Sequence, residues 1–302
     1  MALPAHASTL ERVWHYAYLT ICGLILLFLI APILIVIPLS FNAEPYFTFT
    51  AKMLGLDPDG YSLRWYRNIV EFGMNAPNAT GPGWWADMWE NADWIRAAKN
   101  SFIIGIASTL LATALGTLAA LGLSRPEMPF RRSIMALLIS PMIVPLIITA
   151  TGLFFFYSST GLAQTYPGII MAHATLGIPF VIITVTATLV GFDWQLARAA
   201  QSLGADGRTT FRRVILPLIL PGVISGALFA FVTSFDEVVV VLFVADFDQQ
   251  TIPRQMWNGI REQISPTILA VATILVIISV ALLTVLELLR RRNERIRGLS
   301  PG

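Results

Sequence analysis

Six apolar runs, each long enough to cross a lipid bilayer as a helix, constrain this chain more than any other feature. A transmembrane helix needs about 20 apolar residues, because each residue advances about 1.5 Å through a hydrocarbon layer about 30 Å thick. Of the 302 residues 56% are apolar and 13% are charged, which leaves too little polar surface for a soluble domain. The sequence therefore predicts an all-α, polytopic membrane protein with six transmembrane helices, at 16–39, 99–123, 133–157, 167–191, 217–245 and 267–289.

The distribution of arginines predicts how these helices are oriented. Thirteen arginines fall in the segment 1–15, the loops after the second and fourth runs, and the basic tail 290–302, which all share one side. The short loops of the other side carry only Arg254 and Arg261. Because short arginine-rich loops remain in the cytoplasm, both termini are predicted to be cytoplasmic. In the sequence they flank a membrane domain at residues 16–289. The run 16–39 is too long for a signal-peptide core, so we expect it to be retained as a span.

The predicted external loop 40–98 is rich in tryptophan. Tryptophans at this side of a membrane anchor at the lipid headgroups, and they also serve as docking residues for a protein partner. Both interpretations remain open for the five of them, Trp65, Trp84, Trp85, Trp89 and Trp94.

Several classes of protein are disfavoured by composition. The net charge of +2 does not suggest nucleic-acid binding. Cys22 is the one cysteine, so we expect no disulfide and no cysteine-based metal cluster. The chain lacks a phosphate-binding loop of the type GxxxxGKS/T and the clustered His, Asp and Glu of a membrane metalloprotease. We therefore expect no catalytic residues, no bound metal and no ATP hydrolysis by this chain.

Small residues and prolines predict how the helices contact one another. Ser108, Ala112, Gly116 and Ala120 recur every four residues in the second run, which predicts a stripe for close helix packing. Prolines and glycines in the third and fifth runs predict kinks, either purely structural or part of a transport pathway. They are Pro141, Pro145, Pro217, Pro221, Gly222 and Gly226.

A charged stretch, RAAQSLGADGRTTFRRVILP at 198–217, lies in the predicted cytoplasmic loop 192–216 and enters the fifth run. Before it, Asp193 is a predicted helix N-cap, and Gly204 is a predicted stop for a short helix. On that helix Leu196, Ala199 or Ala200, and Leu203 share one face. Such an amphipathic helix lies either on the lipid surface or in a groove of another protein.

A second helix is predicted directly after the turn at Gly204. Thr209 or Thr210 is the expected cap of this helix. The spacing predicts that it places apolar residues opposite Arg212 and Arg213 and enters the membrane at Pro217. The apolar residues of that face are Phe211, Val214, Ile215 and Leu218.

The spacing of residues in this loop resembles the EAA loop of ABC importer permeases, in which two alanines are followed by a glycine and then by I-x-L-P. The matching residues are Ala199, Ala200, Gly204, Leu216 and Pro217, with Val214 in place of the isoleucine. One position departs from the pattern, because Arg198 stands where the family has an acidic residue. The segment SFDEVVVVLFVADFDQQTIPRQMWNGIREQISPTILAVATILV and the six runs are also similar to the second permease subunit of spermidine/putrescine-type importers.

This resemblance implies a type I ABC importer permease (MetI-like) fold in the inner membrane of a bacterium. It implies a coupling helix at Arg198 to Gly204 that docks on an ATPase. It also implies import of a small solute by alternating access, with putrescine or spermidine as the leading candidate. The partners it implies are a homologous second permease subunit, two copies of a cytoplasmic ABC ATPase that bind ATP and Mg, and an extracytoplasmic solute-binding protein.

Candidate residues for a substrate pathway lie in the third and fifth runs. Asp236 and Glu237 are carboxylates deep in an apolar run, where charge is costly and commonly faces a cavity or a partner. They are suited to bind a cationic amine, and they are equally consistent with a solvated helix end or with helix packing. Phe155 and Tyr157 are candidate aromatic contacts for an amine or are lipid-facing residues. His173 has no recognisable acidic partner in the sequence and is interpreted as a packing residue rather than a proton carrier.

Two other functions are considered beside the importer. A self-contained secondary transporter for a small cationic solute would also need broken helices and intramembrane acids, but we find no internal repeat of spans. An intramembrane enzyme using His173 with Asp236 or Glu237 has no motif in its favour. Amines, amino-acid derivatives and phosphonates all remain open as substrates.

Overall fold

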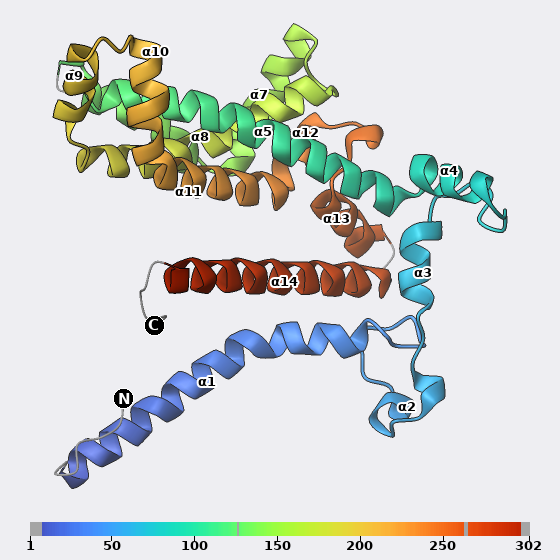
Figure 1. Ribbon diagram of the computed structural model, residues 1–302. Coiled ribbons are helices and arrows are strands. Elements are labelled where there is room, and N and C mark those ends of the chain that lie inside the picture. The colour runs from blue at the N-terminus through green and yellow to red at the C-terminus, as the bar shows by residue number, and fades with distance from the viewer. Residues whose placement is uncertain (1–7, 126, 263–264, 297–302) are drawn as a thin grey trace. The chain divides into compact units, whose positions relative to one another are not determined.

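The structure of the chain is a computed structural model that describes residues 8–125, 127–262 and 265–296. Its regular elements are helices, with one isolated β-bridge between Asn42 and Tyr61 in the described residues. The chain divides into two units, residues 73–258 and residues 1–72 with 259–302. Figure 1 labels the helices of both units.

The larger unit holds most of the helices. They are α4 (Pro82–Asn91), α5 (Asp93–Leu123), α6 (Arg131–Ile139), η2 (Ser140–Met142), α7 (Leu146–Thr160), α8 (Tyr166–Val190), α9 (Trp194–Ser202), α10 (Gly207–Thr210), η3 (Phe211–Ile215), α11 (Leu216–Phe235), α12 (Val239–Val244), η4 (Phe247–Gln249) and the greater part of α13 (Ile252–Glu262).

The smaller unit contains α1 (Thr9–Leu39), α2 (Ala51–Leu54), η1 (Pro58–Gly60), α3 (Arg64–Glu71) and α14 (Thr267–Ile296). Within this unit α14 packs against α1 and α3, and the Thr267 hydroxyl donates a hydrogen bond of 2.9 Å to Asn68 Oδ1 of α3. α1 begins earlier than the predicted residue 16, because Ser8 and Glu11 form a capping box at its start. The apolar stretch of α1 is unburied within the chain, which is typical of a helix that faces lipid or another subunit.

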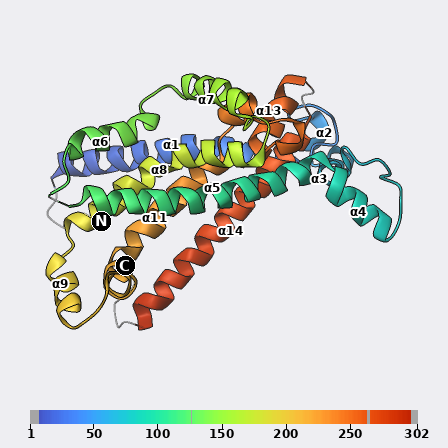
Figure 2. The same ribbon diagram turned by 90° about the horizontal axis from the view of Figure 1, so that it is seen from above.

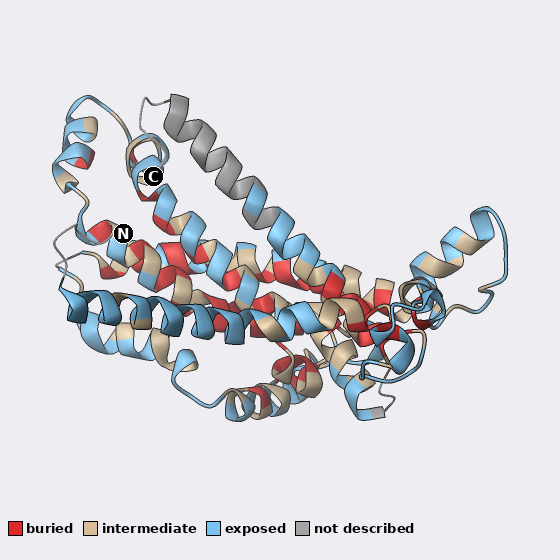
Figure 3. Cartoon of the chain, turned by 90° about the horizontal axis from the view of Figure 1, so that it is seen from below, coloured by how far each residue is buried: buried red, intermediate tan, exposed pale blue. Residues whose placement is uncertain are grey.

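The core of the larger unit is a bundle of α5, α8 and α11 (Figure 1). Buried residues gather along these helices (Figure 3). The small-residue stripe predicted on α5 is buried in this bundle, which confirms its packing role. An added Cβ at Gly116 would lie 2.7 Å from the Val181 Cβ of α8, so the two backbones approach too closely for any side chain there. An added Cβ at Gly226 of α11 would lie 2.5 Å from Thr184 Oγ1 and 2.8 Å from the Val181 Cα of α8.

We expect Gly116→Val to destabilise the bundle by about 1–3 kcal/mol, because a valine must displace Val181 or separate the two helices. Thermal unfolding of the purified protein in detergent measures this loss. Gly152→Val on α7 is the matched control, since an added Cβ there meets nothing within 4 Å. Equal melting temperatures of the two variants would contradict the close approach.

The third and fifth predicted spans are not single straight helices. Residues 131–142 and 146–160 are bent by 96° at a break that contains Pro145, so the predicted run 133–157 is not one straight helix and has the expected kink at a proline. The fifth predicted run, 217–245, is divided in the structure, because α11 ends at Phe235 and α12 starts at Val239. Four helices of the described residues are continuous and apolar enough to cross a membrane: α1, α5, α8 and the run Gly207–Phe235.

The sixth predicted span, 267–289, coincides with the first part of α14, whose apolar portion among the described side chains is Thr267–Ala281. α14 continues to Ile296, into the predicted tail 290–302, and residues 297–302 lie outside the described part of the chain.

Candidate functional site

The predicted coupling helix is present as α9. Its N-terminus is capped by Asp193, whose carboxylate accepts a hydrogen bond of 2.8 Å from the Gln195 N–H. At its C-terminus the Gly204 N–H donates to the Gln201 carbonyl over 2.9 Å, and the Ala205 N–H donates to the Ala200 carbonyl over 3.0 Å. This pair of bonds is a Schellman motif, which requires the positive φ of +89° that Gly204 adopts. The predicted cap and the predicted glycine stop are both confirmed.

The outer face of α9 is apolar and uncovered within the chain. Leu203 is 90% exposed and Leu196 is 47% exposed, with Ala199 exposed between them. Ala197, by contrast, is buried towards the rest of the unit. α9 lies with α10 at the end of the helical bundle where α5 ends (Figures 1 and 2). The arrangement leaves one small apolar face free for a partner.

The second helix of the stretch is capped by Asp206 rather than by Thr209 or Thr210. The Asp206 carboxylate accepts a hydrogen bond of 2.9 Å from the Thr209 N–H, and this contact with Thr209 lowers the pKa of the Asp206 carboxyl. Thr210 is buried. An aspartate binds the free amides of a helix start more strongly than a threonine, so Asp206 is the better cap in this sequence.

The predicted apolar face of that second helix is correct only in part. Phe211, Val214 and Ile215 are half-buried, whereas Leu218 is 50% exposed. The reason is η3, a π-helical turn at Phe211–Ile215. Its extra residue changes the direction in which the side chains of the following residues point around the helix axis. Arg212 and Arg213 are exposed, as predicted.

Arg198 lines a cleft of about 550 Å³ between the end of α5, α9 and the start of the following helix. Trp194 and Arg125 line the same cleft, with the Arg125 guanidinium 5.8 Å from the centre of the Trp194 ring. Arg198, which stands where the family has an acid, is exposed and shares this cleft with one basic residue, Arg125, and one acidic residue, Glu127. Leu216 and Pro217, the last residues of the motif, lie at the start of α11.

Glu237 lies in the break between α11 and α12, where it caps α12. Its Oε1 accepts hydrogen bonds from the Val239 and Val240 N–H groups over 2.7 and 3.0 Å, and its Oε2 accepts from Val240 and Val241 over 2.9 and 3.3 Å. The residue is only 6% exposed. This carboxylate is therefore occupied by the helix that follows it.

His173 of α8 reaches the same break. Its Nδ1 shares a hydrogen bond of 2.8 Å with the Ser234 hydroxyl of α11, which also accepts a bond of 2.9 Å from Ser108 of α5. His173 Nε2 lies 3.7 Å from Glu237 Oε2. The structure thus brings an acidic side chain near His173, although 64 residues separate the two in the sequence, but Nε2 makes no hydrogen bond within the described residues.

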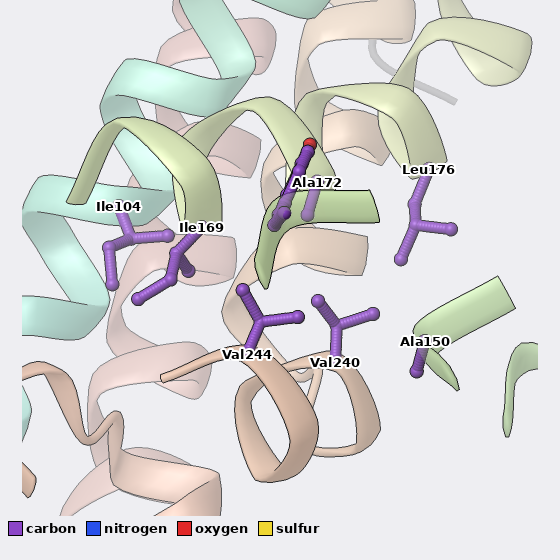
Figure 4. Packing of buried hydrophobic residues seen from close by; sticks show 8 residues of the cluster. Ile104, Ala150, Ile169, Ala172, Leu176, Val240 and Val244 are labelled. Atoms are coloured by element: carbon purple, nitrogen blue, oxygen red, sulfur yellow. The ribbon is translucent and has the colours of Figure 1, made fainter. Parts of the chain in front are cut away.

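The short helix that Glu237 caps is packed firmly. Val240 and Val244 of α12 point towards Ile169 and Ala172 of α8 in one apolar cluster (Figure 4). Tyr157 of α7 belongs to this cluster and is 5% exposed, so it packs in the core of this structure, and its role as an aromatic contact for a substrate stays a prediction.

The four predicted pathway residues do not form one site. Asp236 is exposed at the end of α11, Phe155 is 68% exposed on α7, and Glu237 and Tyr157 are buried. The structure instead brings other aromatic residues to the end of α11. The Phe235 ring centre lies 5.4 Å from that of Phe102 and 5.5 Å from that of Phe231, and Asp236 is the next residue. The spacing of Phe231 and Phe235, one helical turn apart, was the available signal.

The described residues contain no group of three or more His, Cys, Asp and Glu side chains that could hold a metal ion. Bent and broken helices around a tight bundle, with an amphipathic helix at one end, are features of membrane transport proteins.

The chain belongs to the family of binding-protein-dependent transport system inner membrane components, whose model matches residues 112–295. It is 31% identical over 267 residues to the spermidine/putrescine transport system permease protein PotC of Haemophilus influenzae, covering 88% of this chain and 93% of that one. It is 28% identical over 256 residues to the putrescine transport system permease protein PotI of Escherichia coli, covering 82% and 81%.

The fold agrees with this assignment. The crystal structure of a bacterial ABC transporter involved in the import of the acidic polysaccharide alginate matches with a TM-score of 0.70 at 14% identity, over 94% of this chain and 99% of the matched chain. The chain is therefore a multi-pass permease subunit of an ABC importer with the type I fold, and the self-contained secondary transporter is disfavoured.

Proposed function

We propose that this permease forms part of the path by which an ATP-driven importer moves a polyamine, putrescine or spermidine, across the inner membrane. The observation that carries this proposal is the similarity to PotC over 88% of the chain. Asp236 supports it chemically. An exposed carboxylate next to a cluster of phenylalanine rings suits an ammonium group on an alkyl chain, through charge and cation–π attraction.

The partners of this path are proposed from the family. They are a homologous second permease subunit, two copies of a cytoplasmic ABC ATPase that bind ATP and Mg, and an extracytoplasmic solute-binding protein. Both termini would face the cytoplasm with α9, and the loop 40–98 would face the binding protein. ATP-driven closure of the two ATPases would pull on α9 and switch the bundle between inward-facing and outward-facing states.

Uptake by the complete importer in liposomes tests the substrate. The importer would be reconstituted with its binding protein and ATP, and uptake of labelled putrescine and spermidine would be compared with that of a neutral sugar and a phosphonate. ATP-dependent uptake of a polyamine is expected. Uptake of only the neutral or anionic solute would refute the polyamine proposal while leaving the ABC importer class intact.

Replacing Asp236 with asparagine is expected to reduce polyamine uptake about tenfold or more. The reason is that a charge-assisted hydrogen bond contributes about 1.5–3 kcal/mol, and about 1.4 kcal/mol corresponds to a factor of ten. The initial uptake rate at subsaturating substrate is the measurement. Glu90→Gln, which neutralises another exposed carboxylate in the predicted external loop, is the control and should transport normally. Normal uptake by the Asp236 variant would exclude this carboxylate from the path.

A further inference from the structure

Three arginines line one cavity at the start of the helix that contains α11. Arg208, Arg212 and Arg213, together with Thr209, line a space of about 540 Å³ that is open to solvent. The cavity is separate in its lining from the cleft that contains Arg198. It also plays no part in the apolar outer face of α9, which carries the proposed ATPase docking.

Helical spacing and the π-helical turn together place the three arginines on one side of the segment. Consecutive residues of an α-helix point about 100° apart, so positions i, i+4 and i+5 spread over about 140° of the helix. Arg212 and Arg213 lie within η3, where the wider turn pairs residues five apart as an α-helix pairs residues four apart. Arg208 is four residues before Arg212 and five before Arg213, so it lies one turn away from each of them.

The positive charge of this cavity is not compensated by the chain. Among the residues that the structure describes, no ion pair joins any of the three arginines to a carboxylate. The acid closest in sequence, Asp206, caps the helix through Thr209. Three guanidinium groups with fifteen N–H donors among them favour an anion with several acceptor oxygens, and a phosphate group matches that geometry.

The surface that follows the cavity is apolar and exposed. Pro217, Leu220 and Ile224 succeed Arg213 at spacings of four, three and four residues, and Leu220 and Ile224 are 42% and 51% exposed. They lie within the run Gly207–Phe235, which is long and apolar enough to span a membrane. A charged cavity at the end of a membrane helix that continues into an exposed apolar face fits a ligand with an anionic head and a long apolar chain.

We propose that Arg208, Arg212 and Arg213 bind the phosphate of an anionic phospholipid, with an acyl chain along Leu220 and Ile224. The lipid belongs to the leaflet that the arginine distribution predicts to be cytoplasmic. The acidic surface of an ATPase would pair with the three arginines but, lying outside the bilayer, would not contact Leu220 and Ile224 of the membrane helix. The lipid therefore accounts for both halves of the surface.

The test uses the complete importer purified in mild detergent and placed in nanodiscs of either phosphatidylglycerol or phosphatidylcholine. We expect phosphatidylglycerol to raise the melting temperature, and bound phosphatidylglycerol to be found by native mass spectrometry. The double variant R212Q/R213Q should retain about tenfold less of this lipid, because it loses two charge-assisted contacts. R131Q/R132Q is the matched control, since it removes two consecutive exposed arginines at the start of α6.

Three results would overturn the proposal. The first is equal retention of phosphatidylglycerol by wild type and R212Q/R213Q. The second is the same rise in melting temperature with inorganic phosphate alone, which would indicate a free-anion site. The third is loss of the ATPase from R212Q/R213Q with unchanged lipid retention, which would assign the arginines to the protein partner. If the double variant does not fold, the retention of phosphatidylglycerol is compared between wild type and Arg208→Gln. The melting temperature of wild type is then compared between the two nanodisc lipids.

Discussion

A single aspartate in place of Leu203 should abolish uptake by separating the permease from its ATPase. Leu203 is 90% exposed, so its side chain contributes little to the stability of the isolated chain. In the proposed complex the same side chain is desolvated at the centre of a small apolar interface, where a charge has no partner. Loss of one central residue of such an interface costs about 2 kcal/mol or more, equivalent to about a thirtyfold loss of affinity.

Two measurements on Leu203→Asp distinguish docking from folding. The variant should insert in the membrane and melt at the wild-type temperature, while the ATPase no longer copurifies and uptake falls to background. Leu54→Asp is the control, because Leu54 is 72% exposed on α2 in the predicted external loop. Gly204→Pro is expected to act similarly, since proline cannot adopt a φ of +89° or donate the hydrogen bond to Gln201. Retention of the ATPase by both variants would exclude α9 as the coupling helix.

The sequence predicted the elements that depend on local patterns. Runs of apolar residues fix membrane helices, and Asp193 and Gly204 fix the two ends of α9, because capping depends on a few neighbouring residues. The small-residue stripe on α5 was also readable, since its spacing of four residues places it on one face.

The sequence did not predict features that depend on two distant segments or on a local change of helical type. At the break at residues 236–238 the Glu237 carboxylate binds the amides of the next helix, whereas the sequence left Asp236 and Glu237 open between a helix end, helix packing and a substrate path. The π turn that leaves Leu218 exposed to solvent cannot be predicted from the spacing of apolar residues either. The contact of His173 with Glu237, and that of Phe102 with Phe235, join residues on different helices whose approach is set by packing.

The buried position of Glu237 gives the second large expectation, that Glu237→Leu destabilises the protein by about 3 kcal/mol or more. Leucine leaves the amides of Val239, Val240 and Val241 without their acceptor in a buried site, and each unsatisfied buried donor costs about 1–3 kcal/mol. α12 would then detach from its cluster with Ile169 and Ala172. Glu237→Gln keeps one acceptor oxygen and should lie between leucine and wild type.

Thermal unfolding of the purified variants, together with uptake, separates capping from substrate binding. If Glu237 acts as a cap, the melting temperature should fall from glutamate to glutamine to leucine at this position. Uptake should then fall only in proportion to the amount of folded protein. Glu90→Leu, at an exposed position of α4, is the control and should melt as wild type does. If Glu237→Gln melted normally but lost polyamine uptake, the carboxylate would be a substrate ligand instead. Because the Glu237 carboxylate is bound to the amides of α12, Asp236 is the carboxylate of this pair that can bind a cation. We therefore expect Glu237→Leu to lose stability, and Asp236→Asn to lose transport while it stays folded.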